Sequence, residues 1–149
     1  MVQSNQMVVK ELKFGSDGYH QLLAMRDRLL RTPLGLTWSK EDLDGEAEQL
    51  HFGLFDENQT LIACVVIKLL DEQIAKLRQM AVAEPNRAAG VGRCLVQGVE
   101  EKLRQRGVRV IQMDARKTAV GFYRKLGYKI EGEEFTQVTI PHFRMTREI

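Results

Sequence analysis

The order of apolar and polar residues along the chain predicts an alternation of strands and helices. Apolar and polar side chains alternate over residues 8–14, as in a strand with one buried face. Short apolar segments separated by turns, such as those at 56–59 and 71–72, predict further strands. These strands are expected at 51–55, 60–70, 73–82, 108–115, 128–135 and 142–147.

The spacing of apolar residues predicts four helices. The first is expected to begin at Ser16 or Asp17, either of which can cap it, and to run to about Arg31, because Pro33 disfavours a helical residue before it. Its apolar stripe comprises Leu22, Leu23, Met25, Arg26, Leu29 and Leu30. The other three are expected at 39–49, which is acidic, at about 88–106, where Val91, Leu95, Val99 and Leu103 share a face, and at 118–126.

This order of elements predicts one α/β domain over residues 1–149, built as a mixed sheet flanked by helices. The sequence contains no repeats, linkers or low-complexity segments, and residues 1–6 are expected to be disordered. A chain of 149 residues can bury a sufficient core without a metal ion or a disulfide.

Composition and charge exclude several classes of protein. Cys64 and Cys94 have no paired spacing, which argues against a zinc site or disulfide framework and predicts a reducing, cytoplasmic location. The longest apolar run, 61–67, is far shorter than the ~20 residues of a membrane span, and we expect neither a signal peptide nor a membrane partner. A net charge of +2 argues against nucleic-acid binding, and the cations within 102–109 are explained more simply as complementing a helix dipole.

The segment most indicative of ligand binding is 87–92, Arg-Ala-Ala-Gly-Val-Gly, which follows a strand and opens a helix. Backbone N–H groups at a helix start have no partner within the helix, the dipole adds positive charge, and glycines let a phosphate approach. Arg87 and Arg93 bracket the site with full charges. The segment lacks the Gly-Lys-Ser/Thr of a P-loop and the third glycine of a dinucleotide fingerprint. The alternative is a plain helix start with small residues for packing.

The pattern Arg87-x-x-Gly90-x-Gly92 resembles the acyl-coenzyme A loop of the GNAT superfamily of N-acetyltransferases. A second segment, 119–128, resembles that family's Ala-x-x-Phe-Tyr-x-Lys-x-Gly-Phe/Tyr motif, and 140–145 resembles a subgroup of small bacterial members. The resemblance implies the GNAT fold, an α/β (α+β) domain with a mixed, mostly antiparallel central sheet of about six to seven strands and about four helices. It also implies acetyl-CoA as the acyl donor, without a metal ion.

The resemblance assigns roles to individual residues. The pantetheine arm of acetyl-CoA would pair with the backbone of Met80, Ala81 and Val82, and the Met80 N–H would stabilise the oxyanion. The rest of the coenzyme site would comprise Arg87, Ala88, Ala89, Gly90, Val91, Gly92, Arg93 and Phe122. Tyr123 would be the general acid that protonates the departing thiolate, because a phenol is neutral at pH 7. Spacing alone is equally compatible with Tyr123 as a core aromatic residue.

The general base is open. Many family members carry a carboxylate on the strand that leads to the oxyanion donor, but residues 73–82 include no acid. The candidates elsewhere are His51, His142, Glu84 and Asp114, with a water relay or an amine that arrives already neutral as the alternatives.

The nature of the acceptor is open as well. The acidic residues from Glu41 to Glu48 would attract a cationic amine, unless they form a solvated helix face. Lys76 and Arg78 would instead bind a carboxylate on the acceptor, and alternation places both on the same side of their strand as Met80.

We therefore expect an acyl-CoA-dependent N-acetyltransferase that moves acetyl to the primary amine of a small molecule by direct attack. The alternatives are a non-catalytic acyl-CoA sensor or scaffold, favoured by the missing strand carboxylate, and a protein N-terminal or lysine acetyltransferase. Homodimers are common in the family, so a homodimer is allowed. Residues 71–126 hold 12 Lys and Arg against 6 Asp and Glu, around the expected site of a polyanionic coenzyme.

Overall fold

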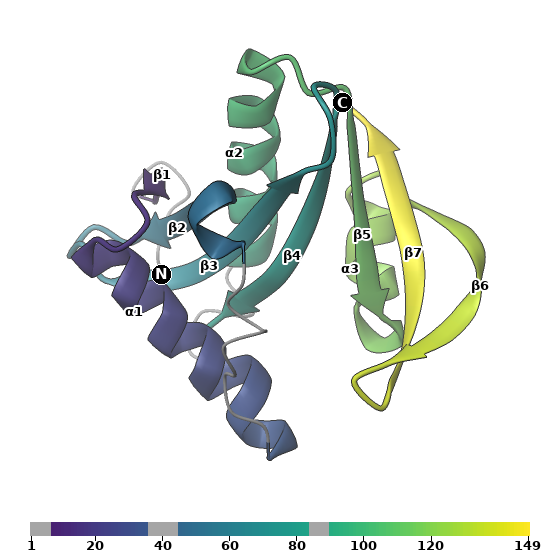
Figure 1. Cartoon of the computed structure of the whole chain (residues 1–149), viewed down its shortest axis with the longest axis horizontal. Helices are drawn as coiled ribbons and strands as arrows, with labels where there is room; N and C mark the ends of the chain where they lie inside the picture. Colours follow the sequence, from purple (N-terminus) through teal and green to yellow (C-terminus); the bar gives the residue numbers. More distant parts are fainter. Residues whose placement is uncertain (1–6, 36–44, 84–89) are drawn as a thin grey trace.

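A computed structural model describes residues 7–35, 45–83 and 90–149 as one sheet with helices on both faces (Figure 1). The strands are β1 (Val8–Leu12), β2 (Leu50–Phe55), β3 (Leu61–Leu69), β4 (Ile74–Val82), β5 (Val110–Arg116), β6 (Lys129–Gln137) and β7 (Ile140–Glu148). The α-helices are α1 (Asp17–Arg26), α2 (Val91–Gln105) and α3 (Val120–Lys125). The predicted fold class is therefore confirmed.

The sheet has seven strands in the order β1-β2-β3-β4-β5-β7-β6. Every neighbouring pair is antiparallel except β4 and β5, which are parallel. That parallel pairing joins only Ile74–Leu77 to Val110–Met113. Beyond it the two strands separate, and Figure 1 shows them meeting near the C-terminus and spreading apart toward α3. The sheet is thus open along half the length of its two central strands.

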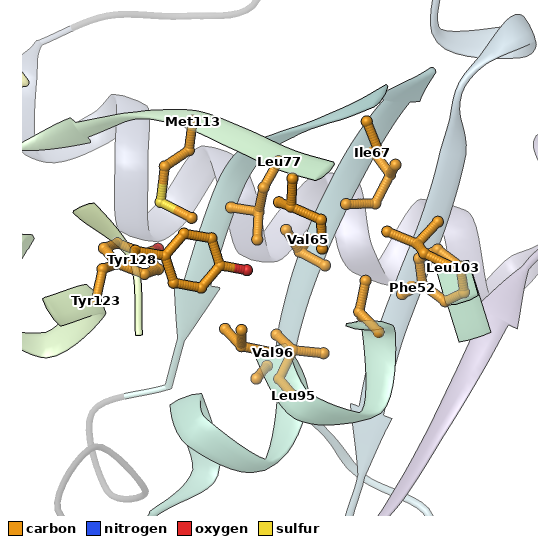
Figure 2. Close-up of a cluster of buried hydrophobic side chains, with 14 of the residues drawn as sticks. Phe52, Val65, Ile67, Leu77, Leu95, Val96, Leu103, Met113, Tyr123 and Tyr128 are labelled. Atoms are coloured by element: carbon orange, nitrogen blue, oxygen red, sulfur yellow. The ribbon is translucent and has the colours of Figure 1, made fainter. Parts of the chain in front are cut away.

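The two faces of the sheet bury separate apolar clusters. The larger lies under α2 and α3 and includes Leu95 and Val96 of α2 with Val65 and Leu77 of the strands (Figure 2). The smaller lies under α1 and includes Leu22 and Met25 with Cys64 and Ala81 of the sheet. The apolar stripes predicted for the first and third helices thus pack on the two opposite faces of the sheet.

A bulge in β4 corrects one prediction about which side chains share a face. Cys64 pairs with Ala81 and Val66 with Arg78, so Gln79 and Met80 together lie opposite a single residue of β3. Gln79 has a φ of 54°, in the left-handed region. An extra residue shifts the side-chain alternation by one position. Lys76 and Arg78 therefore lie on the α1 face, whereas Met80 packs into the cluster under α2.

The first predicted helix continues past α1 in altered form. A π-helical turn, η2 (Asp27–Arg31), and a 3₁₀ turn, η3 (Thr32–Leu34), carry it to the residues around Pro33. Ser16 caps the helix, accepting from the Tyr19 N–H at 3.2 Å. The predicted end near Arg31 is therefore wrong: the α-helix itself ends at Arg26, and the helical turns run on to Leu34, because Thr32 before Pro33 keeps helical angles (φ -55°, ψ -43°).

The acidic helix expected at 39–49 appears within the described residues only as a 3₁₀ turn, η4 (Glu46–Glu48). Residues 36–44 lie outside the description, as do 1–6 and 84–89. Glu46 is buried and forms an ion pair with Arg26 at 2.7 Å. The idea of a solvated or substrate-facing acidic surface is therefore wrong for Glu46, because the buried Arg26 needs a counter-charge.

Candidate active site

The separation of β4 and β5 leaves a cavity of about 290 Å³. Its walls come from η2 and η3, from β4 and β5, from the turn η6 (Lys117–Ala119) and α3, and from the β6–β7 hairpin. Side chains from both faces of the sheet line it: Met80 and Tyr123 from the α2 side, Lys76 and Asp114 from the α1 side. The cavity thus connects the two faces through the gap between the strands.

Tyr123 and Met80 meet at the α2 side of this gap. The Tyr123 hydroxyl donates to the Met80 Sδ at 3.6 Å. The Tyr123 ring packs edge-on against Phe122 and Tyr128, and Figure 2 shows Tyr123 and Tyr128 together at one end of the core. Burial raises the pKa of Tyr123, so the hydroxyl keeps its proton at neutral pH. Tyr123 is therefore both a core aromatic residue and a cavity-lining donor.

The start of α2 lies beside this pair. Gly90 caps the helix with a φ of 75°, and the first helical hydrogen bond is that of the Cys94 N–H to the Gly90 carbonyl at 3.0 Å. The N–H groups of Val91, Gly92 and Arg93 thus have no acceptor within the helix. A Cβ atom on Gly92 would lie 3.0 Å from Cζ of Phe122, so glycine permits this close packing. Arg87, Ala88 and Ala89 lie outside the described residues.

The α1 side of the cavity is rich in cations. Among the residues that the structure describes, Arg31, Lys76, Arg78 and Arg116 line it together with one carboxylate, Asp114. Asp114 accepts from Lys76 at 3.1 Å and from Arg144 at 2.6 Å. Burial would raise the pKa of Asp114, but these two partners outweigh burial and hold it below its usual value. A carboxylate stabilised in this way is a weak base, which removes Asp114 from the candidate bases.

His142 is the histidine that the structure places at the cavity. Its Nδ1 lies 2.8 Å from the Ile140 carbonyl oxygen, which can only accept, so Nδ1 carries the hydrogen. The ring stacks on Phe135 with 5.9 Å between centroids. Nε2 makes no hydrogen bond within the described part of the chain, and the ring lines the cavity. In the neutral ring Nε2 therefore bears a lone pair available to a ligand.

His51 lies elsewhere, in a buried polar cluster under α1. Its Nε2 donates to the Glu46 carbonyl at 2.7 Å, and its ring packs edge-on against Tyr19. It does not line the cavity, so the structure does not support it as a base. Glu84 lies outside the described residues.

The sequence alone did not point to several residues that line the cavity, among them Arg31, Arg116 and Ile140. Arg31 follows the first helix and Ile140 begins β7, more than a hundred positions apart in the chain. No local sequence pattern predicts their common position, because they line the same cavity only once the α1 layer and the β6–β7 hairpin have packed around it.

Two further features bear on function. In the described ranges, no group of three or more His, Cys, Asp or Glu side chains is placed to bind a metal ion. Within the same ranges, no helix is both long and apolar enough to cross a bilayer.

Comparison with known families decides the identity of this fold. Residues 37–149 match the family model described as an acetyltransferase (GNAT) domain. The chain belongs to the GNAT acetyltransferase family. The match takes in β2 to β7, and so includes the divergent strands, the start of α2 and Tyr123.

Relatives of this GNAT chain include three proteins of Bacillus subtilis. The uncharacterized N-acetyltransferase YitI is 34% identical over 117 residues, 74% of this chain and 78% of YitI. The uncharacterized protein YyaT is 40% identical over 75 residues, 50% of this chain and 51% of YyaT. A third protein, BSU40680, is 33% identical over 73 residues, 49% of this chain and 50% of BSU40680. The chain thus spans about half the length of two of these relatives.

Solved structures share the GNAT fold at low sequence identity. Escherichia coli ElaA superposes with a TM-score of 0.80 at 21% identity, covering 95% of this chain and 99% of ElaA. A GNAT acetyltransferase from Elizabethkingia anophelis with acetyl-CoA bound gives a TM-score of 0.73 at 19% identity, covering 97% and 99% of the two chains. At such identities the likeness establishes the fold alone.

Proposed function

We propose that this GNAT protein transfers acetyl from acetyl-CoA to the primary amine of a small molecule by direct attack. The observation that carries the proposal is the cavity that joins both faces of the sheet, with Tyr123 and Met80 on one side and a polar, charged wall on the other. Such a gap lets a thioester arrive from the α2 side and an amine from the α1 side.

The backbone of β4 would receive the acyl donor. Because of the bulge, Gln79 and Met80 together lie opposite one residue of β3. On the other side of β4, the pairing with β5 ends at Leu77, before these two residues. The Met80 N–H would donate to the thioester carbonyl, where negative charge develops as the amine attacks. The N–H groups of Val91, Gly92 and Arg93, which have no acceptor within α2, would hold the coenzyme phosphates.

Two side chains would move the protons. The amine nitrogen forms the new C–N bond and the C–S bond breaks, so the nitrogen loses a proton and the sulfur gains one. Tyr123 would donate a proton to the departing coenzyme A sulfur. In the structure the same hydroxyl donates a hydrogen bond to the sulfur of Met80. His142 would accept the proton from nitrogen at Nε2, directly or through one water, while the Ile140 carbonyl holds the ring by Nδ1–H.

The test is release of free thiol from acetyl-CoA in the presence of a panel of small primary amines and of peptides with free N-termini and lysines. Amine-dependent thiol release, with an acetylated small amine identified by mass spectrometry, is expected. Tight acetyl-CoA binding without thiol release from any member would favour the sensor or scaffold role. Turnover confined to the peptides would favour a protein acetyltransferase.

Location and assembly belong to the same proposal. A chain whose Cys64 and Cys94 are both free suits the reducing cytoplasm. A homodimer stays a prediction, which sedimentation equilibrium tests.

A further inference from the structure

The described wall on the α1 side of the cavity carries more cations than anions. Within the described residues, Lys76, Arg78 and Arg116 line the cavity with a single carboxylate, Asp114. That carboxylate already forms ion pairs with Lys76 and with Arg144. No negative charge is therefore left on the described wall to attract a cationic amine.

Arg78 is the most informative of these cations. It is half-buried on β4, and its guanidinium donates to the neutral amide oxygen of Gln49 at 2.7 Å. Burial lowers the pKa of Arg78; Glu46 acts against this, while Arg26 and Arg31 add to it. The charge of Arg78 is thus poorly compensated by its surroundings, and an anion in the cavity would relieve it.

Arg116 presents a second guanidinium at the other edge of the gap. It ends β5 opposite His142 of β7, is half-buried, and forms no ion pair within the described residues. Asp114 and Arg116 lie on the same face of β5, because side chains two positions apart in a strand point the same way. The ion pair of Asp114 with Lys76 shows that this face is the α1 side, which also carries Arg78. Guanidinium groups bind carboxylates and phosphates through paired N–H donors.

The coenzyme's own phosphates are not expected to supply this anion. They belong at the start of α2, whose apolar stripe packs on the opposite face of the sheet. The bulge at Gln79 is what separates the two regions, because it turns Met80 toward α2 while Arg78 stays on the α1 side. The α1 side is the side left for the acceptor.

We infer that the acceptor amine carries an oxyanion, either a carboxylate or a phosphate, and that Arg78 and Arg116 recognise it. This inference rests on the proposed acetyl transfer. It names the substrate class as small amino acids or phosphorylated amines. His142, paired with Arg116 across β5 and β7, then lies beside the bound anion, near the amine of the same molecule.

The experiment compares amines in matched pairs that differ in the anionic group alone. β-Alanine is set against β-alaninamide, glycine against glycinamide, and O-phosphoethanolamine against ethanolamine, with kcat/KM measured by thiol release. We expect at least a tenfold preference for the oxyanion member of one or more pairs, and the carboxylate and phosphate pairs distinguish the two chemistries. Equal rates, or faster turnover of the neutral members, would overturn the inference.

Variants localise the preference. Arg78→Gln and Arg116→Gln should each reduce it to threefold or less while the Kd of acetyl-CoA changes less than twofold. Lys117→Gln is the matched control, because Lys117 adjoins Arg116 but is exposed, pairs with Glu134 at 2.9 Å and does not line the cavity. An equal loss in Lys117→Gln would assign the effect to overall charge and contradict the inference. Arg78→Lys keeps the charge and should retain part of the preference. It takes the place of Arg78→Gln if that variant misfolds.

A binding measurement separates this inference from the proposed reaction. Calorimetric titration of the CoA-saturated protein with the same paired amines requires no turnover. Tighter binding of the oxyanion members, lost in Arg116→Gln, would support the inference even if no amine were acetylated and the proposed function had failed. Equal affinity of both members of every pair would contradict it, whatever the catalytic result.

Discussion

The hydroxyl of Tyr123 on α3 donates a hydrogen bond to the sulfur of Met80 on β4, with 3.6 Å between oxygen and sulfur. This contact crosses the gap where β4 and β5 separate, and it pairs a buried phenol with a sulfur acceptor. A thioester drawn into the gap would bring a second sulfur to the same hydroxyl. The bulge at Gln79 is required for the contact, because without it the Met80 side chain would lie on the other face of the sheet.

Replacing Tyr123 by phenylalanine should lower kcat by about tenfold or more, since proton donation to the leaving sulfur is lost. The Kd of acetyl-CoA should change less than twofold, because the ring remains. Tyr128→Phe is the matched control: its hydroxyl donates to Glu100 at 2.9 Å, inside the core. That variant should lose about 1.5–3 kcal/mol of unfolding free energy, as expected for a hydrogen bond to a charged group, with kcat unchanged. Wild-type kcat in Tyr123→Phe would remove the general-acid role.

His142→Asn tests the proposed proton acceptor. The asparagine amide can keep the hydrogen bond to the Ile140 carbonyl but has no counterpart of Nε2. We expect kcat/KM at neutral pH to fall about a hundredfold and the deficit to shrink as pH rises, because a larger fraction of the amine is then already neutral. His20→Asn is the control, because His20 is exposed and does not line the cavity. A pH profile of His142→Asn parallel to that of the wild type would indicate a purely structural role.

Gly92→Ala should disturb the coenzyme side of the cavity. The new Cβ would lie 3.0 Å from Cζ of Phe122 and 3.6 Å from Cε of Met80, so the aromatic ring must shift. We expect several-fold weaker acetyl-CoA binding and a loss of about 1 kcal/mol in unfolding free energy. Gly121→Ala meets no atom within 4 Å and should instead stabilise α3 slightly, by about 0.4–1 kcal/mol. Calorimetry and urea unfolding measure both, and equal behaviour of the two variants would argue against close packing at Gly92.

Asp114 should make stability depend on pH. Its folded-state pKa lies below the usual value, so its contribution is fully present above the unfolded-state pKa of about 3.9 and disappears as pH falls through the folded value. Asp114→Asn should therefore cost about 2 kcal/mol of unfolding free energy at pH 7, discounted for the partial exposure of Lys76 and Arg144, and progressively less as pH falls below the unfolded-state pKa. Glu134→Gln, which breaks an exposed pair with Lys117, should cost less than about 1 kcal/mol. A deficit in Asp114→Asn that does not vary with pH would contradict this account.

The sequence by itself determined the elements and the family resemblance. Within the described residues, apolar periodicity located the seven strands and the helices α1, α2 and α3, because burial of one face imposes a local repeat. It placed the end of α1 about five residues too late, and of the helix expected at 39–49 only a 3₁₀ turn is described. The motifs at 87–92 and 119–128 lead to the proposed acyl-CoA site for a similar reason: the residues expected to hold the phosphates, and those of the short aromatic helix, are adjacent in the sequence.

The tertiary structure decided which side chains share the cavity. The bulge at Gln79 arises from pairing between β3 and β4, so alternation within β4 could not reveal that Met80 and Arg78 face opposite sides. The buried pair of Arg26 and Glu46 joins residues twenty positions apart, and it turns one acidic residue of a predicted surface into part of the interior. Arg116 and His142 become neighbours through the pairing of β5 with β7. Such contacts depend on strand register and layer packing, which no local pattern encodes.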